Sequence, residues 1–155
     1  YLIIRTSGVY SNHKQNNFLH TMLKLFLSKK SIDVVGDQVC CPTPSWWLAE
    51  VILKIIAKKL AGSFNKDIKL LHATCRGEVS WYNFTKHILY YLNSFDNKNH
   101  HVEINKISFK NYPSKVIRPN YSVLDNSLLN SIGIDSISWS KALKKTLQYM
   151  KSINE

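Results

Sequence analysis

One stretch of sixteen residues, Val34–Ala49, constrains the fold more than any other part of the chain. In this stretch an apolar run leads into an acid and an amide, and Pro42 and Pro44 then flank Thr43. Each proline fixes its own φ and keeps the preceding residue out of the α region, so this segment is predicted to be extended. Thr43 is then expected to cap a helix, with Pro44 at the first helical position, where the missing N–H costs nothing.

The polar tip of this stretch lies where a strand is expected to end and a helix to begin. Asp37 and Gln38 stand at this tip. In open α/β sheets, ligands bind at the ends of strands in just such positions. A strand-to-helix turn without any ligand would carry the same residues, because most such turns bind nothing. The stretch therefore predicts a strand, a loop and a helix, and it leaves both interpretations of the loop open.

Periodicity along the rest of the chain predicts alternating strands and helices. Four strands are expected, at residues 1–5, 32–35, 68–74 and 102–108. Four long helices are expected to follow the capping residues Asn16 or Asn17, Thr43, Ser80 and Ser138, and a short helix is expected between Asp125 and Gly133. Polar loops are expected at 11–15 and 96–101. This order, without an internal repeat or a linker, predicts a single α/β unit over residues 1–155.

Apolar spacing also predicts which faces are buried. Residues 1–5 and 68–74 are almost continuously apolar, as buried parallel strands are. The helix after Thr43 is expected to bury the stripe Leu48, Val51, Ile52, Ile55, Ile56 and Lys59 or Leu60. The helix after Ser138 is expected to bury the stripe Trp139, Ala142, Leu143, Thr146, Leu147 and Met150.

Charge and cysteine content exclude several functional classes. The net charge of +11 invites a nucleic-acid or membrane partner. Arg5, Arg76 and Arg118 are the only arginines, however, and the lysines are spread along helix faces, so a solvated surface is the preferred interpretation. No apolar run reaches the roughly 18 residues that span a bilayer. We therefore expect neither a nucleic-acid nor a membrane partner.

The three cysteines and the histidines do not form a recognisable metal or disulfide pattern. Cys40, Cys41 and Cys75 lack CxxC spacing, and the histidines lack HExxH spacing. A reduced, cytoplasmic protein without a metal site is the expectation.

Known catalytic signatures are also missing, which directs attention to residues that hold ligands. The chain has no GxSxG elbow, no Walker loop and no GxGxxG turn. Polar side chains at strand ends and helix starts remain: Asn16, Asn17, Asp37, Gln38, Thr43, Ser80 and Arg118. Arg118 either donates hydrogen bonds to loop carbonyls or pairs with a ligand phosphate.

Six short motifs follow one another along almost the whole chain. They are Arg5–Tyr10, Asn16–Phe18 with Thr21–Leu25, Asp37-Gln38 with Pro42-Thr43 and Leu48-Ala49, Ser80–Phe84, Arg118–Asp125, and Trp139 with Ala142-Leu143. Each motif alone is weak, but six in order form a specific pattern. The succession resembles the C-terminal half of the dTDP-4-dehydrorhamnose reductase family, which are extended short-chain dehydrogenases that make dTDP-L-rhamnose.

The resemblance implies a Rossmann-type oxidoreductase that uses NADPH or NADH and whose C-terminal part, with its small substrate-binding subdomain, forms a nucleotide-sugar pocket. The residues that it places at this pocket are Gly8, Asn16, Asn17, Gln38, Thr43 and Arg118, with Gly8 at the floor. The family usually has Trp where Gly8 stands. The resemblance places no catalytic residue in this chain, because the family's Gly-rich loop, its Tyr-x-x-x-Lys pair and a supporting Thr are expected before the first strand. Without the proton donor and the cofactor site, this chain alone is expected to be inactive.

Two other interpretations of the same resemblance stay open. The beta subunit of methionine adenosyltransferase is similar in this region and acts through protein–protein contact, so a non-catalytic regulator is one alternative. A decayed, inactive homologue is the other. The sequence does not decide whether the protein forms a homodimer, and it does not identify the sugar.

Overall fold

The computed structural model describes residues 1–13, 16–95, 99–114 and 116–154. Residues 14, 15, 96–98, 115 and 155 lie outside this description, and with them parts of the loops expected at 11–15 and 96–101. The helices are α1 (Phe18–Ser28), α2 (Ser45–Leu60), α3 (Trp81–Phe95), the 3₁₀ turn η1 (Phe109–Asn111), α4 (Ser127–Ser131) and α5 (Trp139–Asn154). The strands are β1 (Ile3–Arg5), β2 (Val9–Tyr10), β3 (Ser31–Val35), β4 (Val39–Cys40), β5 (Thr43–Pro44), β6 (Leu70–His72), β7 (Val79–Ser80) and β8 (Glu103–Ile107).

The strands pair two by two within the described part of the chain. The pairs β1–β6, β2–β5 and β3–β8 are parallel, and β4–β7 is antiparallel. Ile4 lies opposite Leu71, and Val34 lies opposite Lys106. Parallel strands separated in sequence by helices are the mark of an α/β fold, so the predicted fold class is confirmed. The two-residue strands β2, β4, β5 and β7 were too short for periodicity to predict.

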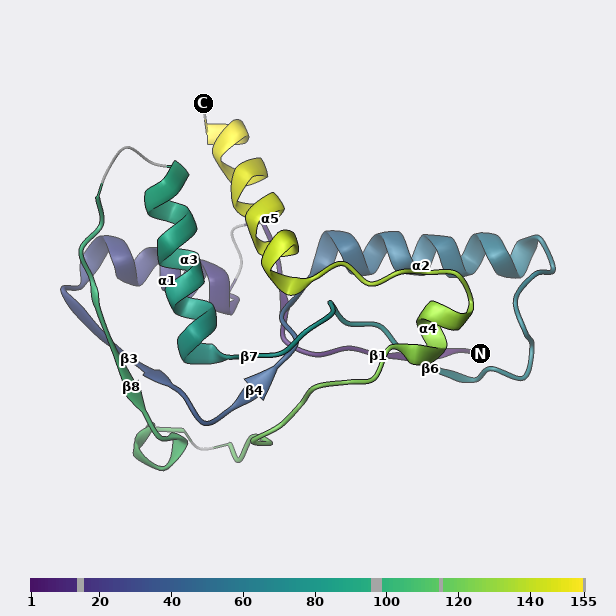
Figure 1. The fold of residues 1–155 in the computed structure, drawn as a ribbon, viewed down its shortest axis with the longest axis horizontal. Coiled ribbons are helices and arrows are strands. Elements are labelled where there is room, and N and C mark those ends of the chain that lie inside the picture. Colours follow the sequence, from purple (N-terminus) through teal and green to yellow (C-terminus); the bar gives the residue numbers. More distant parts are fainter. Residues whose placement is uncertain (14–15, 96–98, 115, 155) are drawn as a thin grey trace.

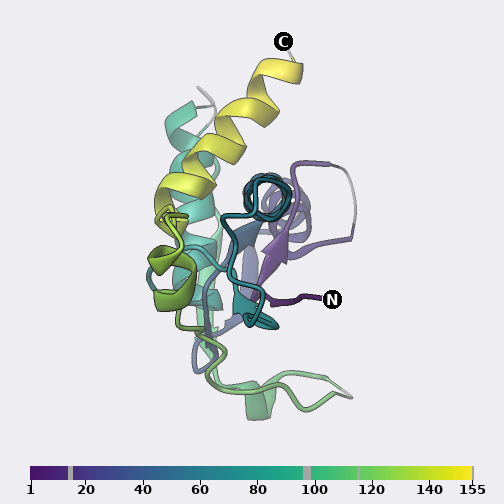
Figure 2. The same cartoon turned by 90° about the vertical axis from the view of Figure 1, so that its right-hand side faces the viewer.

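The long helices divide into two groups. Figure 2 shows α3, α4 and α5 on one side of the molecule and α1 and α2 on the other. Along the long axis, α1, α3, β3 and β8 form one end and α2, α4, β1 and β6 form the other (Figure 1). The N-terminus lies at the end that contains α2 (Figure 1).

Each end of the molecule has its own apolar core, and α5 contributes to both. The first core joins α1, β3 and α3. Its two largest fully buried side chains are those of Tyr10 and Phe84. The second core joins α2, β6 and α4 around Val51, Ile55 and Leu71. Leu143 of α5 lies in the first core and Ala142 in the second. The predicted stripe of α5 is therefore confirmed.

Three of the predicted helix caps are present. The side chain of Asn17 accepts from the backbone N–H of His20, and Ser80 accepts from that of Asn83, both at 3.2 Å. Ser138 accepts from the N–H of Lys141 at 3.4 Å. These short polar side chains act locally, which explains why the sequence alone found them.

The cap predicted at Thr43 is wrong. Helix α2 begins at Ser45, its N-cap residue is Pro44, and no side chain caps it. Thr43 instead belongs to β5, which pairs with β2 and so continues the extended segment by one residue. Its hydroxyl bonds elsewhere in the core, as described below.

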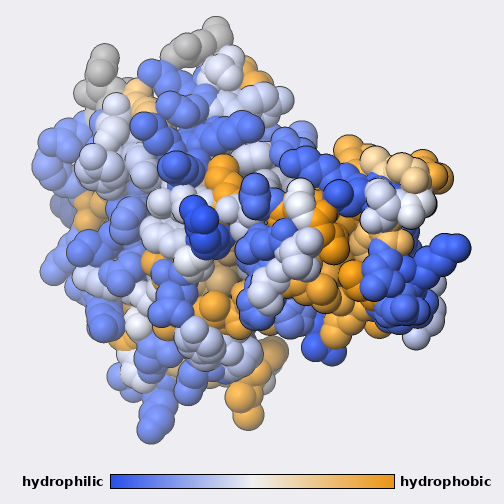
Figure 3. Space-filling model, turned by 45° about the vertical axis from the view of Figure 1, so that its right-hand side comes forward, coloured by the Kyte–Doolittle hydropathy of each residue, from blue (hydrophilic) through white to orange (hydrophobic). Residues whose placement is uncertain are grey.

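Two predictions of burial are also wrong. Ile3 in β1 is 52% exposed, because β1 pairs only with β6 in the described part of the chain and its other side is open. On α2, Val51 and Ile55 are buried as predicted, but Ile52, Ile56 and Leu60 are exposed and Trp47 is buried instead. Apolar side chains accordingly gather on the surface at this end of the molecule (Figure 3).

Within the described residues, none of the helices combines the length and the apolar composition needed to cross a bilayer.

Candidate functional site

A pocket of about 640 Å³ lies between the start of α1, the end of β3 and the segment that follows β8. Five of the six residues expected at a ligand pocket line it: Gly8, Asn16, Asn17, Gln38 and Arg118. These residues come from segments more than a hundred positions apart in the sequence, and the fold brings them together. The aromatic residues Phe18, Trp81, Phe109 and Tyr112 and the acid Asp33 complete the polar and apolar walls. Their role as ligand contacts stays a prediction.

Gln38 lines the pocket and keeps one polar group unpaired. Its side chain is only 4% exposed, and its Nε2 is buried without a hydrogen-bond partner among the described residues. Leaving a buried amide donor unpaired costs about 1–3 kcal/mol. Buried polar groups are almost always paired. Because Nε2 has almost no surface open to the pocket, a ligand oxygen could pair it only after the Gln38 side chain turns toward the pocket.

Asn17 joins the pocket to the start of α1. Its Oδ1 accepts from the N–H of His20, and its Nδ2 donates to the carbonyl of Ser11 at 3.4 Å. One of the two amide N–H groups is left for a ligand. The positive end of the α1 dipole lies here as well, and it favours an anionic ligand group.

Arg118 supplies the cation of the pocket. The residue is exposed, and no hydrogen bond or ion pair of its side chain is seen within residues 1–13, 16–95, 99–114 and 116–154. A guanidinium group presents a planar fork of donors that matches a phosphate. The acid of the pocket, Asp33, accepts a hydrogen bond from the Asn105 amide at 3.0 Å.

The structure does not bring Thr43 to the pocket with the other five residues. Its side chain is 0% exposed, and its hydroxyl donates to the carbonyl of Cys41 at 2.9 Å and accepts from the N–H of Cys75 at 3.2 Å. The backbone N–H of Thr43 donates to the carbonyl of Gly8 at 3.1 Å. Thr43 therefore fastens the segment behind the pocket floor to the end of β6, and no part of its side chain is left to face a ligand.

Sequence reasoning missed the aromatic wall that Asp37 supports. The hydroxyl of Ser108 donates a hydrogen bond to the Asp37 carboxylate at 2.6 Å. The backbone N–H of Phe109 donates to the same carboxylate at 2.9 Å. The hydrogen bonds from Ser108 and then from Phe109 lower the pKa of Asp37. Because the pKa is lowered, the Asp37 carboxylate is still charged at a pH equal to the ordinary pKa of an aspartate. The contribution of these two hydrogen bonds to stability is lost only when the pH falls through the lowered pKa. About seventy residues separate the partners, so no local sequence signal could have indicated the contact.

The cysteines are not arranged as nucleophiles. All three are buried as free thiols, and burial raises the pKa of Cys40 and that of Cys75 to about 12. A thiol with so high a pKa is almost entirely protonated at neutral pH and is a poor nucleophile. Within the described residues, no group of three or more His, Cys, Asp or Glu side chains could hold a metal ion.

Comparison with known protein families identifies the domain. The RmlD substrate binding domain matches residues 1–152 of this chain. The chain belongs to this family.

Relatives of this RmlD domain include the spore coat polysaccharide biosynthesis protein SpsK of Bacillus subtilis, which is 34% identical over 150 residues, covering 97% of this chain and 48% of that protein. The crystal structure of a dTDP-4-dehydrorhamnose reductase from Clostridium acetobutylicum has a TM-score of 0.83 at 32% identity, over 97% of this chain and 49% of that one. A Bacillus anthracis dTDP-4-dehydrorhamnose reductase in complex with NADP has a TM-score of 0.80 at 29% identity, over 96% and 48%. The chain thus spans about half the length of these relatives, and the predicted membership among extended short-chain dehydrogenases is confirmed.

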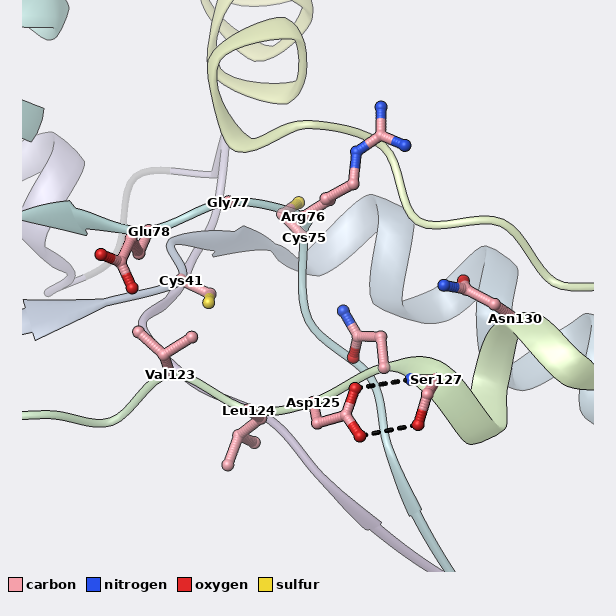
Figure 4. A pocket seen from close by; sticks show the side chains of 11 residues that line it. Cys41, Cys75, Arg76, Gly77, Glu78, Val123, Leu124, Asp125, Ser127 and Asn130 are labelled. Carbon is pink, nitrogen blue, oxygen red and sulfur yellow. Dashed lines mark hydrogen bonds between the residues drawn. The ribbon is translucent and has the colours of Figure 1, made fainter.

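The RmlD domain has a second pocket, of about 330 Å³, between the loop after β6 and the segment that leads into α4 (Figure 4). Several of its polar groups already have hydrogen-bond partners within the domain. Asp125 accepts from the N–H and the hydroxyl of Ser127, at 2.9 and 2.6 Å, and Glu78 accepts from the Tyr121 hydroxyl at 2.6 Å. Arg76 points away from these carboxylates (Figure 4). This pocket therefore offers a ligand fewer free polar groups than the larger one.

A bare Tyr-x-x-x-Lys spacing does occur twice in the RmlD domain, as Tyr10 with Lys14 and as Tyr82 with Lys86. Tyr10 is buried in the first core, and Lys14 lies outside the described residues. Lys86 lies over the ring of Tyr82, with its Nζ 5.5 Å from the ring centre. Tyr10, Tyr82 and Lys86 line neither pocket. The spacing therefore supplies no proton donor to the candidate site.

Gly8 is required by the backbone at the pocket floor. Its φ of +58° is in the left-handed region, and a Cβ atom there would lie 3.1 Å from Cα of Pro42 and 3.3 Å from the carbonyl oxygen of Cys41. The left-handed conformation costs a residue with a Cβ about 1–2 kcal/mol. A Trp, which the resemblance led us to expect at this position, could therefore not be placed on this backbone without moving Pro42.

We expect the substitution Gly8→Ala to lower the free energy of unfolding by about 2 kcal/mol, because strain at φ and the contact with Pro42 add together. Urea titration followed by circular dichroism measures the loss. Gly62→Ala is the matched control, since Gly62 has a φ of +69° but nothing within 4 Å of the added Cβ. Equal losses for the two variants would show that the contact with Pro42 contributes nothing.

Proposed function

We propose that this chain is the nucleotide-sugar-binding half of a dTDP-4-dehydrorhamnose reductase-like enzyme. The reaction would be the NADPH- or NADH-dependent reduction of dTDP-4-keto-6-deoxy-L-mannose to dTDP-L-rhamnose. The observation that carries the proposal is a single pocket that brings Arg118 together with Asn17 at the start of α1. An anionic ligand with hydroxyl groups and a flat ring fits these walls.

Each wall of the pocket suits one part of such a ligand. Arg118 and the positive end of α1 would bind the diphosphate, because both favour phosphate oxygens. The amides of Asn17 and Gln38 would bind sugar oxygens, and Gly8 would allow the sugar to approach the backbone closely. These residues bind and orient, and none of them is placed to donate a proton to a ketone.

The cofactor is assigned to the remaining half of the enzyme. When bound, NADPH or NADH supplies the hydride. The described residues offer no glycine-rich turn at a helix start to hold the pyrophosphate of the cofactor. We therefore propose that no residue of this chain takes part in hydride transfer. We therefore propose that this chain alone does not catalyse the reaction.

The exposed apolar surface supports a role as one half of a larger enzyme. Ile3 of β1 and Leu53 and Leu60 of α2 are exposed. Both elements lie at the same end of the molecule (Figure 1), where hydrophobic atoms show on the surface (Figure 3). Monomeric proteins rarely leave a large contiguous apolar patch facing water. We propose that the part of the enzyme which the relatives have, and which this chain does not span, covers this surface. A second copy of the chain in a homodimer is another partner that could cover the same surface.

We propose that the ligand of the pocket is a nucleotide-sugar and not a nucleic acid. The pocket holds one arginine, and its other walls are amides and aromatic rings. A regulator similar to the methionine adenosyltransferase beta subunit, or a decayed homologue, would have no need of a nucleotide-sugar ligand. Binding of the nucleotide therefore separates the proposal from both alternatives.

We expect Arg118→Ala to weaken binding of dTDP to the chain by about 10- to 150-fold, because a hydrogen bond to a charged group contributes about 1.5–3 kcal/mol. Isothermal titration calorimetry measures the affinity. Arg76→Ala is the matched control, since Arg76 is an exposed arginine that lines only the smaller pocket, and it should bind dTDP as the unaltered chain does. No heat of dTDP binding to the unaltered chain, or equal affinities for the two variants, would reject the proposal.

A further inference from the structure

We propose that Asp37 is a positioning residue: its carboxylate holds the turn that carries Phe109 and Tyr112 as an aromatic wall against the base of the bound nucleotide. This inference rests on the proposed function and assigns the base-binding side of the same pocket. Asp37 itself does not line the pocket. It therefore acts on the ligand only through the two rings.

The turn depends on Asp37 because little else holds it. Residues Phe109–Asn111 form η1, and none of them is buried. Inside the turn, Asn111 donates to the carbonyl of Ser108 at 2.9 Å, and Tyr112 donates to that of Phe109 at 3.0 Å. These bonds shape the turn but do not attach it to the rest of the domain.

The attachment to the domain runs through the end of β3. Beyond the last residue of β3, Gly36 donates to the carbonyl of Ile107 at 2.9 Å. One residue further, Asp37 accepts from the hydroxyl of Ser108 and from the N–H of Phe109. A carboxylate accepts shorter and stronger hydrogen bonds than a neutral oxygen does. The acid thus fixes the first residue of the turn and, with it, the ring of Phe109.

Two rings at the rim of a pocket suit a flat, uncharged ligand group. Tyr112 is 47% exposed, so much of its ring remains free to be covered. Phe109 lines the same pocket, and Arg118 lies on the segment that follows Tyr112. A nucleoside diphosphate presents a base beside a charged diphosphate, which matches aromatic rings beside an arginine. Stacking of a base on an aromatic side chain tolerates any base, since every base has a flat face.

The test compares two ligands of the chain, dTDP and inorganic pyrophosphate, by isothermal titration calorimetry. Phe109→Leu is expected to weaken dTDP binding by about 5- to 150-fold, the range for one base on one ring, and to leave pyrophosphate binding unchanged. Asp37→Ala is expected to weaken dTDP binding by no more than Phe109→Leu does, again without an effect on pyrophosphate. Asp37→Asn, which keeps an acceptor oxygen for the N–H of Phe109, should restore part of the loss.

The double variant distinguishes positioning from general damage. If Asp37 acts through the two rings, Asp37→Ala weakens dTDP binding less in the Phe109→Leu background than it does alone. Asp67→Ala is the control, since Asp67 is an exposed acid distant in sequence from the pocket segments and should change neither affinity. Equal weakening of both ligands by Asp37→Ala, or additive losses in the double variant, would overturn the inference.

Failure of this inference and failure of the proposed function give different results. If the unaltered chain binds dTDP and Arg118→Ala weakens it, while Phe109→Leu has no effect, the base is bound elsewhere and only the inference fails. If the unaltered chain binds neither dTDP nor pyrophosphate, the proposed function and the inference both fail.

Discussion

Replacing Phe84 by alanine is expected to lower the free energy of unfolding by about 3–5 kcal/mol, the usual loss when a buried phenyl ring is removed. Phe84 is 0% exposed, and four other aromatic rings lie around it, those of Tyr10, Phe18, Trp81 and Trp139. Its ring centre is 5.6 Å from that of Tyr10 and 5.9 Å from those of Phe18 and Trp139. These rings belong to β2, α1 and α5, so one side chain joins three elements to α3.

The measurement is a urea titration followed by circular dichroism. A domain of this size is stable by only about 5–15 kcal/mol, so the variant should be largely unfolded at modest urea concentrations. Tyr90→Ala is the matched control, because Tyr90 lies on the same helix but is 65% exposed. The control should lose less than about 1 kcal/mol. Similar midpoints for the two variants would mean that the aromatic cluster does not hold the first core together.

Replacing Thr43 by valine is expected to cost about 2–4 kcal/mol of stability. Valine has nearly the same shape, so the change removes the hydroxyl and little else. The N–H of Cys75 then loses its acceptor and the carbonyl of Cys41 its donor, both in the buried interior. Each unpaired buried group costs about 1–3 kcal/mol.

The same variant decides between two roles for Thr43. Thr43→Ser keeps the hydroxyl and should lose only about 1 kcal/mol, the contribution of one buried methyl group. If Thr43 has only a structural role, Thr43→Val should unfold at lower urea and yet bind dTDP normally while it is folded. Unchanged stability together with lost dTDP binding would instead support the ligand contact that the sequence resemblance implied.

Much of the local structure could be predicted because its causes are local. Asn17, Ser80 and Ser138 cap helices with bonds that reach only three residues along the chain. The apolar spacing of α5 likewise predicted Leu143 and Leu147, since the helical repeat fixes which side chains share a face. The grouping of Gly8, Asn17 and Arg118 in one pocket came from the family resemblance and not from any local signal.

Burial could not be predicted where it depends on what covers a face. The stripe of α2 was assigned by spacing, but Ile52 and Leu60 are exposed and Trp47 is buried. Spacing shows that a helix has an apolar side. It does not show which part of a wide apolar side another element covers, and α2 is apolar around much of its circumference.

The sequence by itself determined the alternation of strands and helices, the three working caps and the family, because propensity, periodicity and motif order are all properties of neighbouring residues. Only the tertiary structure decided which hydrogen bonds two polar side chains accept. The Thr43 hydroxyl accepts from the N–H of Cys75, and the Asp37 carboxylate accepts from Ser108 and Phe109. Both contacts join positions more than thirty residues apart. A short polar side chain bonds to whichever group the folded chain brings within about 3 Å, and that is settled by the packing of whole elements.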